Sequence, residues 1–305
     1  MDALQRRLVP STSALVAFDT VARLGSFSVA AQTLSLTQGA VSRQISALED
    51  QLGILLFQRG SRGVSLTIQG AAYASGIREA LAIIRASSMD AMNRLHSGIL
   101  NLAITPTFGT RWLMPRIGDF VASHKEVTIN FATRGGAIDF EKERIDAAII
   151  HVEKPNWLGT ECILLINESL GPVCSPSFLQ RNPIASPEDM LKLPLLHLAA
   201  REAAWDDWFK SVGLRRSEGR TMQFELLSTA AQACTADLGI ALLPLFLFES
   251  ELESGELVLA FNHLVPSPSA YYLAMPKWKL ANVPVMAFRE WLVGQAVAFM
   301  QGRSR

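Results

Sequence analysis

The sequence predicts an α+β chain of several domains, and three changes of pattern along it carry that prediction. Up to Thr67 the apolar residues recur mostly at helical spacing, and residues 68–95 continue as one long helical pattern. From Gly98 onward strand-like and helix-like segments alternate, which is typical of parallel sheets with helical crossovers. Because 49% of the 305 residues are hydrophobic, the chain can fill the cores of two or three domains.

The first two predicted helices are short and closely connected. Apolar residues at helical spacing predict a first helix that ends near Gly25. Ser26 or Ser28 can cap a second, shorter helix, whose small residues Ala30 and Ala31 allow close packing. A connection of about three residues leads into the next helix, and two short helices joined so tightly form a helix-turn-helix.

Residues 37–51 form the helix on which the functional prediction depends. Thr37 can cap its start, because a threonine hydroxyl accepts a hydrogen bond from a free backbone N–H of the first turn. An apolar stripe is made by Val41, Ile45, Leu48 and Leu52. The opposite face carries side chains that can meet base edges and phosphates in a DNA major groove, namely Gln38, Ser42, Arg43 and Ser46. The alternative is a surface helix of an ordinary globular domain.

Residues 55–66 alternate apolar and polar side chains around a glycine-rich turn, which predicts a small β-hairpin. Arg62 lies in the turn and Arg59 beside it. Next to a recognition helix, such a wing can contact phosphates or the minor groove. The alternative is an ordinary surface hairpin.

The predicted helix from Ile68 to about Leu95 has a long apolar edge, made by Tyr73, Ile77, Leu81, Ile84, Met92 and Leu95. A single helix of this length cannot cover such an edge by itself, whereas the same helix of a second chain would bury it. We therefore expect a dimer through this helix. The alternative is that the edge packs against its own chain.

The remaining elements are predicted from Gly98 to the C-terminus. The expected strands are residues 99–104, 127–131, 147–150, 158–166, 169–174, 195–198, 221–224, 239–243, 258–261 and 270–275. The expected helices begin near Thr105 and Ser186 and cover residues 205–212, 227–237 and 283–299.

Charge and targeting signals constrain the partners. The formal net charge is zero, which counts mildly against nucleic-acid binding. Local charge matters more, because the screening length is only about 8 Å at physiological salt. Up to Thr67 the arginines outnumber the acidic residues by two, so this part is modestly basic. The sequence shows no signal peptide and no apolar run long enough to cross a bilayer, so we expect a cytoplasmic protein without membrane contact.

The sequence lacks common catalytic and metal-binding motifs. It contains no P-loop, no GxSxG elbow, no HExxH and no CxxC pair, and its five histidines are scattered, so we do not expect an enzyme. Cys162, Cys174 and Cys234 lack metal-ligand spacing and are expected to be small core residues rather than a redox switch. Besides a DNA-binding regulator and an enzyme, a transport-type solute-binding protein is the third class of function considered. The missing signal peptide and the helix-turn-helix argue against it.

Many residues in one register resemble the LysR-type transcriptional regulators. In the first part of the chain these are Ala17-Phe18, Gly25-Ser26-Phe27-Ser28-Val29-Ala30-Ala31, Leu34, Thr37-Gln38-Gly39-Ala40-Val41-Ser42-Arg43-Gln44-Ile45, Leu48-Glu49, Leu52-Gly53, Leu56-Phe57, Arg59, Leu66-Thr67 and Gly70. Further residues resemble the branch that includes the glycine-cleavage activator, namely Phe108, Arg111-Trp112-Leu113, Pro115-Arg116, Pro172-Val173-Cys174-Ser175-Pro176, Leu195-Leu196-His197 and Gly239-Ile240-Ala241-Leu242.

The resemblance implies a domain organisation. Residues 1–67 would be a winged helix-turn-helix domain, residues 68–97 a linker helix for dimerisation, and residues 98–305 a regulatory domain shaped like periplasmic binding proteins. That regulatory domain would have two α/β lobes, joined by crossovers near residues 166–171 and 265–271. Lobe 1 would span about 98–167 plus 269–305, and lobe 2 about 168–268.

The resemblance also implies partners. Family members bind promoter DNA, usually as tetramers, and a small effector docked between the lobes changes the bending of the DNA. We therefore expect promoter DNA, further copies of the chain and a small-molecule co-inducer, with RNA polymerase as a candidate further partner and no cofactor.

The DNA contacts are expected from the recognition helix and the wing. Gln38 can bond adenine, Arg43 can reach guanine or a phosphate, and Ser42 and Ser46 can reach either. Phosphate contacts are expected from Thr37, Arg59 and Arg62, and Ser28 completes the predicted surface. Gly39 departs from the family pattern, which often has Pro, Ser or Ala there, and would allow close approach of the backbone to DNA.

The resemblance places an effector pocket between the lobes, lined by Thr105, Thr107, Phe108, Thr133, Arg134, His151, Leu198, Ala199, Ser228 and Thr229. Thr105 and Thr107 stand at a helix start, where free N–H groups favour an anion such as a carboxylate. The alternative is that threonines and serines at such positions only cap helices. His151 is either a pocket residue or a hydrogen-bonded core histidine. It follows Ile150 where the related branch often has Arg-Tyr or a similar aromatic pair, which points to a different effector.

Overall fold

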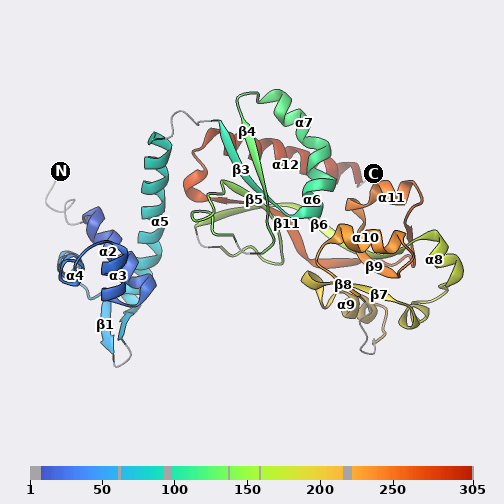
Figure 1. Ribbon diagram of the computed structural model, residues 1–305, viewed down its shortest axis with the longest axis horizontal. Helices are drawn as coiled ribbons and strands as arrows, with labels where there is room; N and C mark the ends of the chain where they lie inside the picture. Colours follow the sequence, from blue (N-terminus) through green and yellow to red (C-terminus); the bar gives the residue numbers. More distant parts are fainter. Residues whose placement is uncertain are drawn as a thin grey trace. The chain divides into compact units, whose positions relative to one another are not determined.

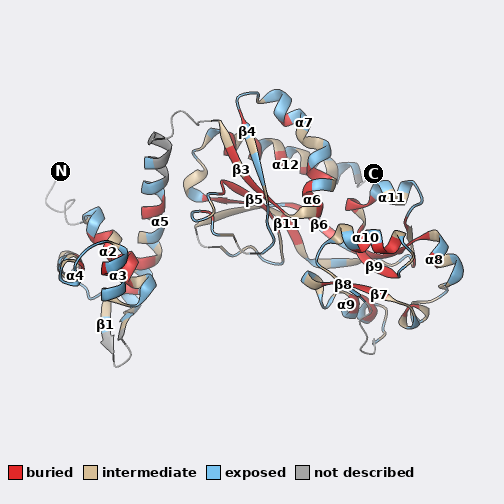
Figure 2. Ribbon diagram, viewed as in Figure 1, coloured by how far each residue is buried: buried red, intermediate tan, exposed pale blue. Residues whose placement is uncertain are grey.

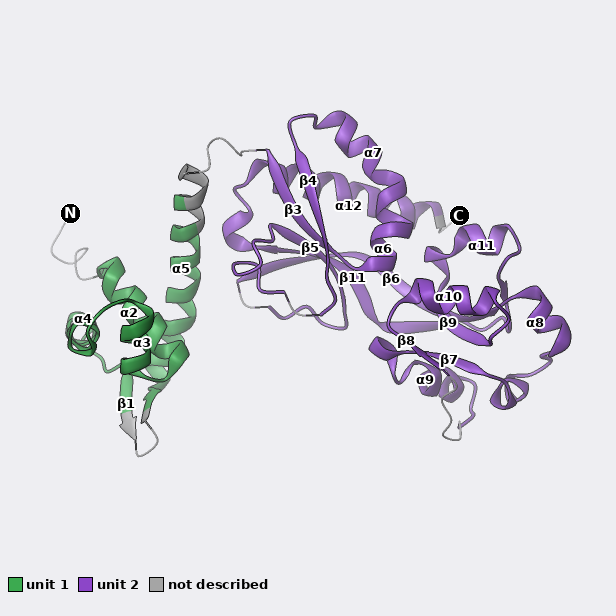
Figure 3. Cartoon of the chain, viewed as in Figure 1, with its two compact units in different colours: residues 1–95 green, residues 96–305 purple. Residues whose placement is uncertain are grey.

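The computed structural model (Figure 1) describes residues 8–60, 63–92, 98–136, 138–157, 159–215 and 222–303. Buried residues gather in separate parts of the chain (Figure 2). These parts form two compact units, residues 1–95 and 96–305 (Figure 3), and each unit is described by itself.

Unit 1 contains the predicted helix-turn-helix and hairpin. Its elements are α2 (Thr12–Leu24), α3 (Phe27–Thr33), α4 (Gln38–Leu52), β1 (Phe57–Gly60), β2 (Gly63–Leu66) and α5 (Ile68–Met92). The helix starts are capped by hydroxyl groups: Ser26, rather than Ser28, accepts from the N–H of Val29 at 3.3 Å, and Thr37 accepts from the N–H of Ala40 at 3.2 Å. Gly25 ends α2 in the left-handed conformation that glycine adopts without steric cost.

The core of unit 1 lies between α2, α4, α5 and the hairpin. Phe18 is fully buried, and its ring lies 5.4 Å from the rings of both Phe57 and Tyr73. A second apolar cluster joins α2 to α3 and to the buried stripe of α4, with Ala17, Val21, Ala30, Ala31, Val41 and Ile45 at its centre. The apolar stripe predicted for residues 37–51 therefore packs inward, and the opposite face of α4 is left to solvent.

The apolar edge of α5 divides into two parts. Tyr73, Ile77 and Leu81 pack in the core of unit 1, so for these residues the alternative of packing within the chain is right. Ile83 and Ile84 are 44% and 45% exposed. The start of α5 is fixed by Gly70, where an added Cβ would lie 2.0 Å from the carbonyl oxygen of Leu56. The arginine Arg78 also pairs with the buried Asp19 of α2 at 3.3 Å.

Unit 2 is built on one mixed sheet with the strand order β4-β3-β5-β11-β6-β9-β7-β8, to which β10 adds beside β6. Its strands are β3 (Ile99–Ile104), β4 (Thr128–Thr133), β5 (Ala147–Val152), β6 (Thr160–Cys174), β7 (Leu195–Leu198), β8 (Met222–Phe224), β9 (Ile240–Pro244), β10 (Val258–Leu259) and β11 (Val265–Pro276). The predicted parallel pairing is correct for β3 with β4 and β5 and for β7 with β8 and β9. It is wrong for β6 and β11, which run antiparallel to their neighbours.

The two strands predicted at residues 158–166 and 169–174 are one strand, β6. Its first part pairs with β11, and from Leu170 it also pairs with β9 (Figure 1). The pairing of β6 with β11 is irregular between Pro266 and Ala270. The polar residues Asn167 and Glu168 interrupt the apolar pattern, but the strand continues through them: Asn167 stands opposite Ala270 of β11 and Ser169 opposite Pro266, with an irregularity between the two pairs.

Helices cover the sheet of unit 2. They are α6 (Pro106–Phe108), the π-helical turn η1 (Gly109–Leu113), α7 (Met114–Ser123), α8 (Pro176–Arg181), α9 (Ala204–Ser211), α10 (Leu227–Thr235), α11 (Glu249–Glu253) and α12 (Val283–Arg303). Short 3-10 turns are η2 (Pro187–Lys192), η3 (Ala199–Arg201), η4 (Leu245–Leu247) and η5 (Lys277–Lys279). The helix predicted from Ser186 is the 3-10 turn η2. Among the described residues, no helix combines the length and the hydropathy that a membrane crossing requires.

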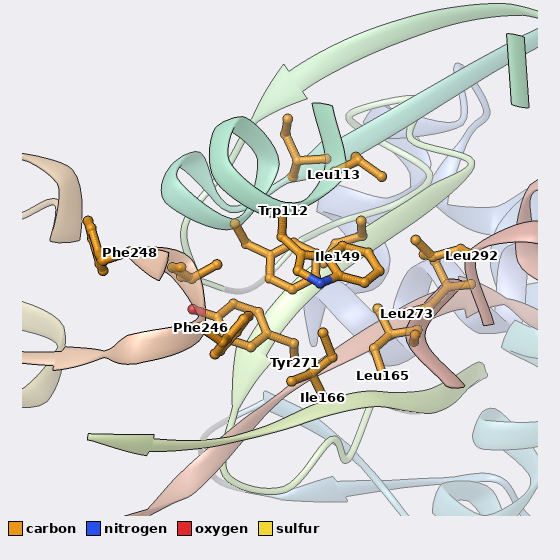
Figure 4. Packing of buried hydrophobic residues seen from close by; sticks show 14 of the residues in the cluster. Trp112, Leu113, Ile149, Leu165, Ile166, Phe246, Phe248, Tyr271, Leu273 and Leu292 are labelled. Carbon is orange, nitrogen blue, oxygen red and sulfur yellow. The ribbon is translucent and has the colours of Figure 1, made fainter. Parts of the chain in front are cut away.

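The largest core of unit 2 gathers aromatic side chains from α6, η1, η4 and β11 (Figure 4). Phe108 stacks on Trp112 at 4.9 Å and on Tyr271 at 4.4 Å between ring centroids. Phe246 meets Tyr271 edge to face at 5.8 Å. Because Phe108 and Tyr271 belong to this packed cluster, the backbone around them has little freedom to shift.

Candidate functional site

The exposed face of α4 carries the predicted DNA-contacting side chains. Gln38, Arg43 and Ser46 are exposed and Ser42 is half-buried, whereas the stripe of Val41, Ile45 and Leu48 is buried. The helix thus turns its polar side chains to solvent because its apolar stripe is fixed in the core of unit 1.

Two contacts hold the start of this surface. The hydroxyl of Ser28, an exposed residue of α3, donates to the Oε1 atom of Gln38 at 3.2 Å. The hydroxyl of Thr37 serves as the N-cap of α4, so this group is already engaged by the helix itself. Gly39 is exposed, and a Cβ added to it would meet no atom within 4 Å. The fold of unit 1 therefore does not require glycine at this position.

The hairpin is tied to the far end of α4. The carboxylate of Glu49 accepts hydrogen bonds from the N–H groups of Leu56 at 2.7 Å and Phe57 at 3.1 Å. In the hairpin, Arg59 of β1 stands opposite Val64 of β2. The other predicted arginine of the wing, Arg62, lies outside the described residues.

Unit 2 contains a cavity of about 400 Å³ that several predicted effector residues line. Six of the ten predicted residues border it: Thr105, Thr107, Phe108, Arg134, His151 and Leu198. Residues that the sequence did not point to also border it, among them Ile138, Ile150, Arg201, Glu225, Leu226 and Tyr271. The cavity therefore brings together the ends of β3, β4, β5 and β7, the start of α10 and the middle of β11.

Four predicted residues do not line this cavity. Thr133 is exposed at the end of β4, and the next residue, Arg134, borders the cavity instead. Ala199 begins η3, so its neighbours Ala200 and Arg201 face the cavity. Ser228 and Thr229 lie inside the first turn of α10, and the cavity is bordered by the residues that precede them, including Leu227.

Thr105 behaves differently from a capping residue. It stands before Pro106 at the helix start, but its hydroxyl makes no capping hydrogen bond. Its Oγ1 atom is buried and has no hydrogen-bond partner among the described residues. The capping-only alternative is therefore wrong for Thr105. A buried hydroxyl without a partner costs free energy, which a bound acceptor or donor would recover.

A buried ionic cluster forms one wall of the cavity. The carboxylate of Glu168, whose side chain is fully buried, lies 2.7 Å and 3.1 Å from two nitrogens of Arg201 and 2.8 Å from Nε2 of His151. A carboxylate only accepts hydrogen bonds, so this contact is a hydrogen bond in the tautomer that carries a proton on Nε2 of His151. Burial alone would raise the pKa of Glu168, but the hydrogen bond from His151 and the charge of Arg201 outweigh it and hold this pKa below its ordinary value.

The cluster joins three distant segments: β5, β6 and η3. It also touches Tyr271, whose ring lies 4.7 Å from that of His151. Burial and the nearby Glu168 carboxylate raise the pKa of Tyr271. His151 is thus both a cavity residue and a hydrogen-bonded one, so the two interpretations of this residue do not exclude each other.

Sequence reasoning missed three members of this site. Glu168 carried one usable signal, an acidic residue inside an otherwise apolar stretch, because a buried carboxylate needs a partner. Arg201 follows a predicted strand by three positions, and Tyr271 lies in a predicted strand, but neither pattern indicates a pocket. Their roles depend on contacts between residues far apart in the chain.

Cysteines and groups of possible metal ligands are the other features that could form a site among the described residues. Cys174 and Cys234 are buried, and burial raises the pKa of their thiols to about 11 and about 12, which disfavours the nucleophilic thiolate form. In the part of the chain that the structure describes, no three His, Cys, Asp or Glu side chains are grouped so that they could hold a metal ion.

Family models match both units. One described as a bacterial regulatory helix-turn-helix protein of the lysR family matches residues 12–71, and one described as a LysR substrate binding domain matches residues 93–296. The glycine cleavage system transcriptional activator of Escherichia coli (strain K12) is 34% identical over 299 residues, which are 97% of this chain and 96% of the activator. The HTH-type transcriptional activator AmpR of Rhodobacter capsulatus is 32% identical over 292 residues, 93% of this chain and 96% of AmpR.

Solved structures are similar as well. The effector domain of the transcriptional regulator AmpR of Pseudomonas aeruginosa superposes with a TM-score of 0.62 at 28% identity, and covers 68% of this chain and 99% of that domain. ArgP from Mycobacterium tuberculosis has a TM-score of 0.60 at 21% identity, with 94% of this chain and 97% of ArgP covered. This similarity supports the fold alone.

Proposed function

This chain belongs to the LysR family of bacterial DNA-binding transcriptional regulators, and we propose that it recognises promoter DNA through α4 and responds to a small molecule in the cavity of unit 2. The proposed boundaries are a winged helix-turn-helix domain at residues 1–67, a linker helix at 68–97 and a regulatory domain at 98–305. Because promoter DNA is the partner, the proposed place of action is the cytoplasm.

For DNA, the proposal rests on the polar, exposed face of α4. Gln38 would read adenine in the major groove, with Ser28 orienting its side-chain amide through the 3.2 Å hydrogen bond. Arg43 would reach guanine or a phosphate, and Ser42 and Ser46 would supply further contacts. Thr37 would contact a phosphate in addition to capping α4. The wing residues Arg59 and Arg62 would contact further phosphates.

Self-association is proposed through α5. Ile83 and Ile84 leave apolar surface exposed on a helix whose first half is already packed in unit 1. The same surface of a second chain would cover these side chains. A dimer presents two recognition helices and requires a roughly palindromic DNA site. The proposed complete assembly is a tetramer of two such dimers. RNA polymerase is proposed as a further partner.

For the effector, the single observation that carries the proposal is the 400 Å³ cavity with the unpartnered hydroxyl of Thr105 inside it. This volume lies in the range of ordinary ligand pockets, about 300–1,000 Å³. Thr107 and Phe108 complete this side, while Arg134 stands at the rim and is paired with Glu143 at 2.7 Å. A carboxylate that bonds Thr105 and competes for Arg134 would be held at both points.

The remaining predicted effector residues would act around that cavity. His151 and Leu198 border it directly. Four predicted residues lie next in sequence to residues that border the cavity, namely Thr133, Ala199, Ser228 and Thr229. They would reach the ligand only after the walls of the cavity rearrange. An effector that binds one arrangement more tightly shifts the population of assemblies, typically by 1–3 kcal/mol.

A genomic binding-site selection with the full chain tests the regulator proposal. The proposal expects enrichment of palindromic promoter sequences and retardation of the same fragments in gel shifts. Gln38→Ala should relax base preference, with about 1–3 kcal/mol lost at the base pair it reads. Arg62→Ala should weaken all sequences alike and reduce the salt dependence of binding. Absence of any enriched sequence would refute DNA recognition, and an unchanged salt slope would refute the phosphate role of Arg62.

A further inference from the structure

Arg201 borders the effector cavity of unit 2 with a side chain that is only 10% exposed. It is the last residue of η3, which directly follows β7, so the sheet fixes where its side chain begins. A guanidinium group carries five N–H donors and accepts no hydrogen bond. In a buried side chain each of these donors needs an acceptor.

The described residues do not supply acceptors for all five donors. The carboxylate oxygens of Glu168 lie 2.7 Å from Nη1 and 3.1 Å from Nη2, so Glu168 can accept two hydrogen bonds. The hydroxyl of Tyr271, which lies beside Arg201, can accept a third. His151 accepts none in the tautomer that donates to Glu168 through Nε2. Nη1 is close to Glu168, but among the described residues no acceptor lies along its N–H bonds. The guanidinium group therefore keeps a donor for a ligand.

The unpartnered hydroxyl of Thr105 lies a short distance from this donor in the same cavity. Ile104 of β3 stands opposite Ile149 of β5, so Thr105 and His151 are one residue out of step on neighbouring strands. Their Cα atoms are therefore about 6 Å apart, because neighbouring strands lie about 4.8 Å apart and each residue rises about 3.3 Å. Nη2 of Arg201 lies 3.4 Å from Nε2 of His151. A ligand with a chain of about five carbon atoms can thus contact Thr105 and Arg201 together.

The neighbouring carboxylate of Glu168 determines which acceptor suits Arg201. The charges of the two side chains cancel within their ion pair. A second negative group bonded to Nη1 would lie about 5 Å from the Glu168 carboxylate, in a buried place where like charges repel strongly. A neutral carbonyl oxygen can accept the same N–H without that repulsion.

We propose that the effector carries, besides the carboxylate held at Thr105 and Arg134, an uncharged carbonyl oxygen that accepts a hydrogen bond from Arg201. The effector is then a keto acid or an acylated acid, rather than an unsubstituted fatty acid or a dicarboxylate. This inference rests on the proposed effector cavity and makes Arg201 a residue that determines specificity.

Titration calorimetry on the full chain tests the proposal with three probes of similar length: 4-oxopentanoate, pentanoate and succinate. The first two differ only in the carbonyl oxygen, and succinate carries a second carboxylate in place of the methyl ketone. 4-Oxopentanoate should bind about fivefold more tightly than pentanoate, because it makes one more hydrogen bond. It should bind about tenfold more tightly than succinate, whose second charge meets Glu168.

Three variants separate the contributions of the ion pair. Glu168→Gln removes the charge that cancels that of Arg201, so succinate should then bind more tightly than 4-oxopentanoate. The double variant Glu168→Gln/Arg201→Met removes both members of the pair, and it should bind 4-oxopentanoate and pentanoate within about twofold of each other. The matched control, Glu161→Gln/Arg289→Met, removes a Glu–Arg pair outside the cavity lining and should keep the native order of the probes. If the Glu168 variants do not fold, the three probes on the native chain still decide.

Each remaining outcome contradicts a definite part of the proposal. Equal binding of 4-oxopentanoate and pentanoate to the native chain would refute the role of Arg201 and leave the proposed carboxylate site intact. Tighter binding of succinate than of 4-oxopentanoate would refute the neutral acceptor. No binding of any probe would overturn the proposed carboxylate site and this inference with it.

Thr105→Val identifies the cavity in which the probes bind. It should weaken all three probes by a similar factor, about fivefold, because each loses the same hydrogen bond to its carboxylate. Arg201 also borders a cavity beside α9, which Thr105 does not line. Unchanged binding of 4-oxopentanoate to Thr105→Val would place the probe in that other cavity and overturn the proposal.

Discussion

Replacing Glu168 with glutamine would leave the guanidinium of Arg201 buried without its counter-ion. The Glu168 side chain is fully buried and that of Arg201 is 10% exposed, so solvent cannot take over the role of the carboxylate. Removing one partner of a buried ion pair typically costs about 3–5 kcal/mol. For a unit of this size each kcal/mol lowers the melting temperature by about 2–4 °C, so unit 2 should melt roughly 10 °C lower.

The pH dependence of this loss has a definite sign. Because the folded-state pKa of Glu168 lies below its ordinary value of 4.5, its contribution to stability is complete above 4.5 and disappears as the pH falls through the folded-state pKa. The difference in melting temperature between the native chain and Glu168→Gln should therefore shrink on acidification. Differential scanning calorimetry from neutral to acidic pH measures it.

The matched control is Glu161→Gln on the same strand. Glu161 pairs with Arg289 at 3.0 Å, but both side chains are about one-third exposed, so this pair should contribute at most about 1 kcal/mol. Two results would refute the reasoning: a loss for Glu168→Gln no larger than that for the control, or a loss that does not change with pH.

Four further substitutions test the structure at single positions, one of them as a control. Gly70→Ala should destabilise unit 1 by about 1–3 kcal/mol in urea unfolding, because the new Cβ meets the carbonyl oxygen of Leu56. Its control, Gly76→Ala on the same helix, adds a Cβ in open space and should stabilise unit 1 by about 0.5–1 kcal/mol. Equal effects of the two substitutions would contradict the packing at Gly70. Gly39→Ala should leave the free energy of unfolding unchanged within about 0.5 kcal/mol, because the new Cβ meets no atom. It should weaken promoter binding in gel shifts by about 1 kcal/mol. Unaltered binding would exclude a close approach of the backbone to DNA at this position. Thr105→Val removes an unpartnered buried hydroxyl and should raise the stability of the ligand-free chain by about 1 kcal/mol, so a lower melting temperature would show that the hydroxyl has a partner.

The helix-turn-helix could be predicted from the sequence because its determinants are local. Ser26 and Thr37 cap helices within three residues of themselves, and Gly25 ends one in the left-handed conformation. The buried stripe of α4 also follows from spacing alone, since a helix places residues three and four apart on one face. Thus the exposed face with Gln38 and Arg43 was predictable without any knowledge of the tertiary structure.

The candidate effector site was only partly predictable. Thr105 and His151 lie at ends of parallel strands, where ligand sites of α/β sheets are expected, and both line the cavity. Ser228 and Thr229 follow the bordering residue Leu227 in the first turn of α10 and do not themselves border the cavity. The sequence does not specify how α10 is rotated against the sheet. The division of the α5 edge, with Leu81 inside and Ile84 outside, likewise depended on the packing partner.

Residue patterns along the chain were enough to place most helices and strands in order and to indicate the family, although they divided β6 into two strands and predicted a helix where the 3-10 turn η2 lies. The meeting of Glu168, His151 and Arg201 follows from the folded chain alone, because Glu168 and Arg201 are 33 positions apart and His151 and Arg201 are 50 apart. The same holds for Tyr271, which lines the cavity together with His151 and Arg201. The physical reason is that a buried charge needs a partner in space rather than in sequence, and that partner is chosen by strand pairing between distant segments.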